Sequence, residues 1–182
     1  MPIPIYSSAA SANNSSLVQL GYVQVGTPVN SIFFSSIPQN YQDLVLIAYG
    51  RNVNDIIEGA DITFNRISQN AYSTTYVTGD GSSASSSRVT NFGAITFLDI
   101  TRSTSNIYAM AELHINSYSL NSKWKTILGK SASDQNGSGN TKFFSSSLRF
   151  DSPITSLTIT KGGNGFAYGS NFALYAVRAI GQ

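Results

Sequence analysis

A histidine and a glutamate two residues apart are the first candidates for chemistry in this 182-residue chain. His114 is the only histidine, and Glu112 precedes it within the alternating run Ile107–Ile115. On a β-strand, residues i and i+2 point to the same face, so the two side chains are expected to share one surface. Such a pair could act as general acid and base. A solvated strand face or a subunit contact is the simpler explanation, and it is the one we expect.

The chain offers little that could hold a metal or activate a nucleophile. Cysteine is absent, which excludes disulfides and thiolate ligands, and a single histidine cannot form a zinc site. Asp55, Glu58 and Asp61 could supply oxygen ligands to calcium, although their spacing does not match an EF-hand loop. No motif singles out the two facing carboxylates that a glycosidase needs. The sequence therefore predicts no metal, no cofactor and no enzymatic activity.

A glycine-rich segment at 162–165 could be mistaken for a phosphate-binding loop. It reads Gly-Gly-Asn-Gly, but no Lys-Ser/Thr follows it and no helix is expected after it. These residues tolerate positive φ angles. We predict a hairpin turn between strands at Ile154–Thr160 and Phe172–Ile180.

Aromatic side chains could stack on sugar rings where they are exposed. The main candidates are Tyr108, Tyr118 and Trp124, and further ones are Tyr72, Tyr76 and Tyr168. A core or interface role is the simpler explanation for each of them, and it is the one we expect. If the protein binds carbohydrate, we expect these aromatics to form the site together with the serine- and glycine-rich segments 79–87 and 131–141.

The composition suits a protein that folds and associates better than it suits an enzyme. Charged residues make up 11% of the chain, aromatic residues 12%, and the net charge is +2. Lysine and arginine are scattered, which argues against nucleic-acid binding. No apolar run approaches the roughly 20 residues that span a bilayer, and the N-terminus lacks the features of a Sec signal. A surface with so few charged residues favours a protein that buries part of this surface in an assembly.

From Leu17 onward, short apolar runs alternate with turn residues, which is typical of β-strands. The expected strands are Leu17–Val25, Ile32–Ile37, Leu44–Tyr49, Ile62–Ile67, Tyr72–Val77, Ala94–Ile100, Ile107–Ile115, Trp124–Leu128, Phe143–Phe150, Ile154–Thr160 and Phe172–Ile180. No helix is expected beyond one turn at Asp55–Gly59. We predict an all-β fold, an antiparallel β-sandwich or jelly roll of about ten strands.

Three segments carry more specific expectations. Leu44–Tyr49 is apolar on both faces, which predicts a central strand covered on both sides. Ile107–Ile115 alternates most cleanly, with Ala109 and Leu113 among the residues expected to face inward. The segments 79–87 and 131–141 are expected to be long mobile loops.

The first sixteen residues differ from the rest and predict a short arm. Two prolines are followed by a run of serine, alanine and asparagine that cannot bury enough surface to order itself. We divide the chain into a flexible arm, 1–16, and a β-sandwich domain, 17–182. The arm is either a frayed terminus or a segment that orders against a neighbouring subunit or a shell. In the second case the contact residues are Pro2, Ile3, Pro4, Ile5 and Tyr6.

Several motifs occur in one order along the domain. Segment 32–46 contains Phe-x-Ser-Ile-Pro-Gln-x-Tyr-x-Asp-Leu and leads into a strand that is followed by Arg51. Ile62–Asn65 reads Ile-Thr-Phe-Asn, and Pro153–Ile159 reads Pro-Ile-Thr-Ser-Leu-Thr-Ile. Phe166–Tyr175 closes the series with Gly-Ser and Leu-Tyr.

These motifs resemble those of small β-sandwich virion proteins of tailed bacteriophages, cyanophages among them. The resemblance runs over most of residues 17–178. Ala176 stands where the family pattern has a glycine, and the proline-bearing arm is outside the pattern. The resemblance implies a virion protein on the capsid surface or the tail fibre, and it identifies no catalytic residue.

Two functions are therefore expected in order of preference. The first is a capsid cement or decoration protein, made in the host cytoplasm and assembled as a homotrimer on the major capsid protein, so that it bridges capsid subunits. The alternative is a tail-fibre or tail-associated module that binds a receptor or carbohydrate. A glycan is a partner only in the alternative.

Overall fold

The computed structural model describes residues 16–54, 58–100 and 106–178. Every regular element within these ranges is a β-strand, and every pair of neighbouring strands is antiparallel. The strands are β1 Leu17–Gln24, β2 Ser31–Phe34, β3 Asp43–Gly50, β4 Glu58–Phe64, β5 Tyr72–Gly79, β6 Ala84–Phe92, β7 Ile95–Ile100, β8 Ala109–Ile115, β9 Lys125–Asp134, β10 Gly139–Leu148, β11 Leu157–Lys161 and β12 Asn171–Val177. The predicted antiparallel β-sandwich is confirmed, with twelve strands among the described residues where about ten were expected.

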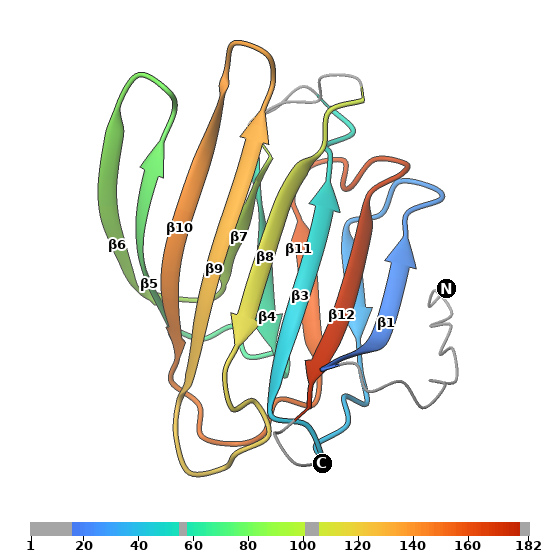
Figure 1. Ribbon diagram of the computed structural model, residues 1–182, viewed down its shortest axis with the longest axis vertical. Helices are drawn as coiled ribbons and strands as arrows, with labels where there is room; N and C mark the ends of the chain where they lie inside the picture. Colours follow the sequence, from blue (N-terminus) through green and yellow to red (C-terminus); the bar gives the residue numbers. More distant parts are fainter. Residues whose placement is uncertain (1–15, 55–57, 101–105, 179–182) are drawn as a thin grey trace.

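Two sheets form the layers of the sandwich (Figure 1). The large sheet has eight strands in the order β1-β12-β3-β8-β9-β10-β5-β6, and the small sheet has four in the order β2-β11-β4-β7. The chain changes sheet at every connection except β5–β6, β8–β9 and β9–β10. Without the β5–β6 and β9–β10 hairpins, the remaining eight strands have the alternating order of a jelly roll.

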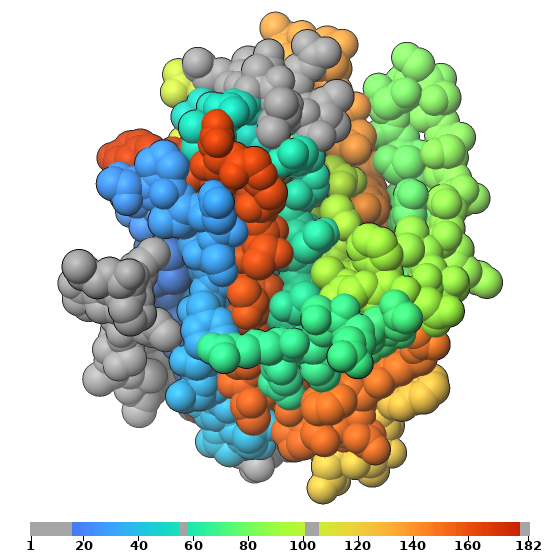
Figure 2. Space-filling model, turned by 180° about the vertical axis from the view of Figure 1, so that it is seen from behind, coloured from blue at the N-terminus to red at the C-terminus, as the bar shows by residue number. Residues whose placement is uncertain are grey.

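The two hairpins extend the large sheet beyond the small one. β9 follows β8, and β10 carries β5 and β6 on its far side. Seen from behind, the β5–β6 hairpin stands beside the small sheet and is separated from it over part of its length (Figure 2). The large sheet therefore has a longer and wider outer surface than the layer that covers its inner side.

The core lies between the sheets and follows from the alternation of side chains along each strand. On β8, Ala109, Ala111, Leu113 and Ile115 are buried, as the sequence predicted. Large side chains from both layers fill the remaining space, among them Phe64 and Phe97 of the small sheet and Leu46 and Phe172 of the large sheet. Burying each side chain of this size contributes about 1.5–3 kcal/mol.

The two segments expected to be long mobile loops are instead strands joined by tight turns. β5 ends at Gly79 and β6 begins at Ala84, and β9 continues to Asp134 before β10 begins at Gly139. The backbone N–H of Asp80 donates to Ser83 O at 3.1 Å, and that of Gln135 donates to Ser138 O at 2.8 Å. Serine and threonine are compatible with exposed strands as well as loops, so composition alone could not decide between them.

The glycine-rich segment 162–165 is not a hairpin turn. β11 belongs to the small sheet and β12 to the large sheet, so the segment starts a crossing between layers. Phe166 after it bridges both Val29 and Asn52. The segment does form a turn, as its glycines predict, but the strands on either side of it do not pair with each other.

β3 is buried on one face only, contrary to the expectation of cover on both sides. Leu44, Leu46 and Ala48 are buried, while Tyr49 is 39% exposed and the other outward residues are half-buried. No described element packs over the outer face of the large sheet, because both extra hairpins lie in the plane of the sheet. An apolar strand therefore contributes to the molecular surface.

The remaining expectations concern the chain ends and the short helical turn. The arm residues 1–15 and residues 55–57 lie outside the described ranges, and Glu58 and Gly59 begin strand β4 instead of belonging to a helical turn. Among the described residues no helix has the length and hydropathy to cross a bilayer.

Candidate functional site: the outer face of the large sheet

The outer face of the large sheet is the most extensive candidate surface, and strand register assembles it. One row of paired residues runs across seven strands, from β1 to β5, and another runs beside it across the same strands. The first row is Tyr22, Ala173, Ile47, Glu112, Lys130, Phe143 and Val77, and the second is Gln19, Tyr175, Val45, His114, Leu128, Ser145 and Thr75. We call these two rows, with Tyr49 and Met110 next to them, the outer face.

Large apolar side chains on the outer face are open to solvent. Val77 is 54% exposed, Phe143 52%, Leu128 45%, Tyr22 41% and Tyr49 39%. A hollow of about 510 Å³ is lined by residues of β5, β8, β9 and β10, outward Val77, Phe143 and Lys130 among them, and by Ala84 of β6. Several large exposed apolar side chains gathered on one face are typical of interaction sites in natural proteins.

Charged groups on the outer face are paired with each other. Glu112 and Lys130 face each other across β8 and β9, and Lys130 Nζ lies 3.1 Å from Glu112 Oε2. An exposed pair of this kind contributes little stability, about 0–1 kcal/mol. Its effect is to place opposite charges side by side, so that this part of the surface presents little net charge to a partner.

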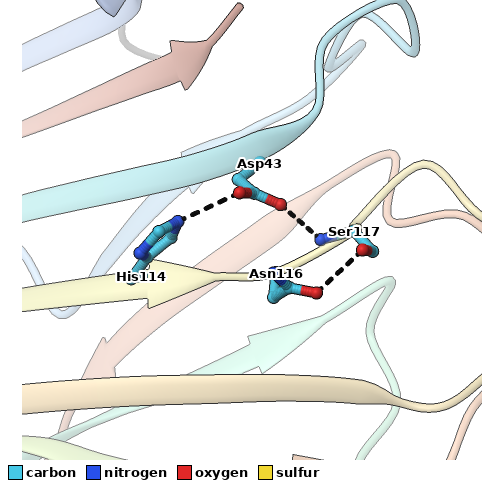
Figure 3. Close-up of polar contacts among 4 residues, drawn as sticks. All are labelled: Asp43, His114, Asn116 and Ser117. Atoms are coloured by element: carbon cyan, nitrogen blue, oxygen red, sulfur yellow. Dashed lines mark hydrogen bonds and ion pairs between the residues drawn. The ribbon is translucent and has the colours of Figure 1, made fainter. Parts of the chain in front are cut away.

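His114 is held by a buried aspartate and not by Glu112 (Figure 3). Asp43 is 4% exposed, and its Oδ2 lies 3.2 Å from His114 Nε2. Its Oδ1 accepts the backbone N–H of Ser117 at 2.6 Å. Val45 lies opposite His114 in the register, which brings Asp43 diagonally across the strand pair. His114 and Glu112 therefore have different partners: Asp43 binds His114, and Lys130 binds Glu112.

Among the described residues, the side-chain partner of His114 is Asp43, and no hydroxyl is bonded to the imidazole. A triad needs a hydroxyl or thiol bonded to the histidine. The hydroxyl of Ser117, whose backbone N–H binds Asp43, donates to Asn116 Oδ1 at 2.7 Å and not to the imidazole (Figure 3). What the arrangement can do is tie β3 to the end of β8 and present a half-exposed imidazole on the outer face.

Sequence reasoning missed Asp43 because the signal lies in strand pairing. Asp43 is 71 residues from His114 along the chain. In the sequence it directly precedes the apolar run Leu44–Tyr49, and only the pairing of β3 with β8 makes it the partner of the histidine. The placement of Asp43 at the start of an apolar strand was the one available hint.

The three main aromatic candidates do not form one site. Tyr118 is fully buried and its hydroxyl donates to Pro38 O. Trp124 is 61% exposed beside the start of β9. Tyr108 precedes β8 and donates to Tyr168 O at 2.9 Å, with the guanidinium of Arg51 5.6 Å from its ring centre. β8 separates Tyr108 from the other two by seven residues, or about 23 Å.

The further aromatic candidates are equally dispersed. Tyr72 is fully buried, Tyr76 is half-buried under Lys142 Nζ at 4.7 Å, and Tyr168 is 68% exposed. The two serine- and glycine-rich turns, in contrast, do lie side by side at one end of the large sheet (Figure 1).

The acids considered for calcium each have a different partner. Glu58 Oε2 lies 2.5 Å from Lys161 Nζ, and Asp61 Oδ1 accepts the hydroxyl of Thr96 at 2.6 Å. Asp55 lies outside the described residues. Within the described ranges no three histidine, cysteine, aspartate or glutamate side chains gather as metal ligands do.

The arm contact candidates Pro2, Ile3, Pro4, Ile5 and Tyr6 also lie outside the described residues. Comparisons of the chain with family models, with curated proteins and with solved structures find no match in any of the three.

Proposed function

We propose that this chain is a structural virion protein of a tailed bacteriophage, a capsid decoration protein that assembles as a homotrimer and binds the major capsid protein. The observation that carries the proposal is the outer face, a wide apolar surface whose charged groups pair with one another. Such a surface suits lasting contact with protein better than turnover of a substrate. The resemblance of the motifs between residues 32 and 175 to phage virion proteins supports the same role.

The size of the outer face fits a protein interface. Its seven strands, each about 4.8 Å wide and about 20 Å long, give an area of roughly 700 Å². A standard interface buries about 800 Å² on each partner. Closed symmetry with identical subunits is the common mode of such assemblies, and a trimer matches the symmetry points of an icosahedral shell.

The alternative of a carbohydrate-binding tail module, in its expected form, has weaker support. It required the aromatic candidates and the two serine- and glycine-rich turns in one site. Trp124 lies at the beginning of β9 and the turn follows its end, so ten residues, or about 33 Å of strand, separate them. Tyr118 is buried beside a different loop.

The test is the mass of the purified protein in solution, measured by light scattering after size exclusion. We expect a mass of three times 19.5 kDa. Ile47→Lys, in the middle of the outer face, is expected to give a folded monomer because it buries a second positive charge beside Glu112, which Lys130 already neutralises. Thr160→Lys, on the exposed side of β11, is the matched control and is expected to leave the trimer intact.

Attachment to the shell is tested separately with purified particles. We expect the protein on the capsid in a copy number that matches the symmetry points of the shell. A monomer that is unchanged by Ile47→Lys, together with a copy number typical of a tail, contradicts the proposal.

A further inference from the structure

The sheets formed by the described strands have four edges, and these differ in how open their backbones are to a further strand. β2 has only four residues. β1 and β7 each lie in a ladder that is interrupted by a register shift. β6 has nine residues, contains neither proline nor lysine, and pairs with β5 without a shift from Ala84 to Val89. Natural sheets protect their edges with short strands, bulges, lysine and proline, so β6 is the least protected of the four.

β6 is open to solvent along its whole length. Eight of its nine residues are exposed, and Val89 is half-buried. The strand ends the large sheet on the side where the β5–β6 hairpin stands apart from the small sheet (Figures 1 and 2). Among the described strands only β5 pairs with β6, so the second edge of β6 is available to a strand from outside.

The hairpin turn determines which backbone groups of β6 face this open edge. The N–H of Asp80 donates to Ser83 O at 3.1 Å, so these two residues form a hydrogen-bonded pair. Bonded and non-bonded pairs alternate along an antiparallel ladder. The odd-numbered residues of β6 therefore bond to β5, and the even-numbered residues direct their N–H and C=O groups to the open edge. In the part of β6 without a register shift, these are Ala84, Ser86 and Arg88.

We propose that β6 is an interaction surface for a second copy of this chain, and that two β6 strands pair antiparallel about a two-fold axis. The bonded pairs of such a contact can join only even-numbered residues, because these have the free groups. With Ser86 opposite the partner's Ser86, Ala84 lies opposite the partner's Arg88, and Ser85 opposite the partner's Ser87. In this register all the free N–H and C=O groups of Ala84, Ser86 and Arg88 find partners.

The side chains favour this register over its neighbours. Serine lies opposite serine at the axis and in the pair beside it, and such pairs hydrogen-bond across strands. Arg88 lies opposite the partner's Ala84, which directly follows the turn that contains the partner's Asp80, so the arginine is placed near an acidic group. A register shifted toward the end of β6 brings the two arginines closer together. One shifted toward the turn leaves Arg88 without a strand residue opposite it.

The contact is small, which indicates where it acts. The stretch from Ala84 to Arg88 is about 17 Å long and a sheet is about 10 Å thick, so the edge offers roughly 170 Å². A standard interface buries about 800 Å² on each partner. We therefore expect β6 pairing to be weak in solution and to join copies that another contact already holds close together. On a capsid these copies belong to neighbouring trimers. That last step rests on the proposed function, whereas the pairing itself does not.

The first experiment uses the absence of cysteine from the chain. Ser85→Cys and Ser87→Cys are prepared separately in the full chain. A non-bonded antiparallel pair holds its Cα atoms about 4.5 Å apart, which suits a disulfide. Residue 85 faces residue 87 of the other copy, so we expect the oxidised mixture to form at least about tenfold more covalent dimer than either variant alone. A non-reducing denaturing gel measures the dimer whether or not the protein is also a trimer. Equal cross-linking in the mixture and in the single variants overturns the proposal.

The second experiment places a charge on the two-fold axis. Ser86→Lys and Ser86→Glu each put like charges opposite each other, whereas their equimolar mixture puts opposite charges there. Sedimentation at millimolar protein measures association beyond the mass found in dilute solution. We expect each variant to weaken this association about fivefold, the mixture to recover it, and the control Thr160→Lys to change nothing.

Association that neither charge weakens, or that the mixture does not recover, overturns the proposal, and pairing of β6 with β1 of another copy would give that second result. Circular dichroism shows that the variants fold, as expected for an exposed residue whose backbone groups do not bond to β5. A monomer in dilute solution, in contrast, contradicts the proposed function alone.

Discussion

Lys161 Nζ lies 2.5 Å from Glu58 Oε2, although the lysine side chain is 1% exposed and the glutamate side chain is 38% exposed. The lysine is the last residue of β11, and it crosses to the first residue of β4 on the neighbouring strand. Its stem is buried and its charge is neutralised at the edge of the small sheet. Two other lysines, Lys125 and Lys142, are also buried, so the sandwich encloses cations whose partners lie at its edges.

Glu58→Gln is expected to lower the free energy of unfolding by about 1–3 kcal/mol, because it leaves a buried ammonium without its counter-charge. The exposure of Glu58 places the effect below that of a fully buried pair. Adding Lys161→Met should recover most of the loss, since the double variant has no charge to neutralise. Urea unfolding monitored by circular dichroism measures both. A double variant as unstable as Glu58→Gln contradicts the assignment.

Tyr72 is expected to make the protein sensitive to alkali. Burial raises the pKa of Tyr72 from 10.0 to about 12. Between about pH 10 and pH 12 the unfolded chain loses the phenolic proton and the folded chain keeps it, so the free energy of unfolding falls as pH rises.

Tyr72→Phe tests this dependence. The hydroxyl accepts the N–H of Phe64 at 2.9 Å and donates to Ile67 O at 3.0 Å. The variant should lose about 1–2 kcal/mol at neutral pH, because a buried N–H is left unpaired. Its deficit should shrink between pH 10 and pH 12, as the wild-type protein loses stability there. A constant deficit across that range contradicts the prediction.

Gly129 on β9 lies opposite Phe144 on β10, and a Cβ at Gly129 would overlap the phenylalanine ring. Gly129→Ala should therefore destabilise the hairpin by about 1–3 kcal/mol through overpacking. Combining it with Phe144→Leu should cost less than the sum of the two single changes. Thermal unfolding measures this coupling. Gly26→Ala is the matched control, because nothing lies within 4 Å of its added Cβ, and it should be nearly neutral.

Deleting residues 1–16 should abolish attachment to the capsid while the domain stays folded. The first strand begins at Leu17, and the one backbone bond described from Ser16 is its carbonyl accepting Arg178 N–H at 3.0 Å. Co-sedimentation with particles lacking the protein measures attachment, and thermal unfolding measures folding. Undiminished attachment shows that the arm has no part in it.

Much of the local structure could be predicted from sequence. The alternation in Ile107–Ile115 identified the buried residues of β8, and the turn residues separated most strands correctly. β6 and the far ends of β9 and β10 were missed, because Ser-rich stretches such as Ala84–Phe92 carry no apolar alternation. Their strand conformation comes from hydrogen bonding to β5 and to each other.

The candidate sites depended on pairing that no local pattern reports. Glu112 and His114 were correctly placed on one face of a strand, yet Lys130 and Asp43 became their partners through the neighbours of β8. The β5–β6 and β9–β10 turns lie at the same end of the large sheet because β10 pairs with both β9 and β5.

The sequence by itself determined the all-β class, the inward residues of the cleanest strands and the scarcity of catalytic groups. These follow from composition and from a period of two residues, which each strand expresses alone. The tertiary structure decided which strands pair, which apolar face stays uncovered and which turns adjoin. An apolar strand such as Leu44–Tyr49 can be covered on one face or two, and only the arrangement of the second layer determines how many.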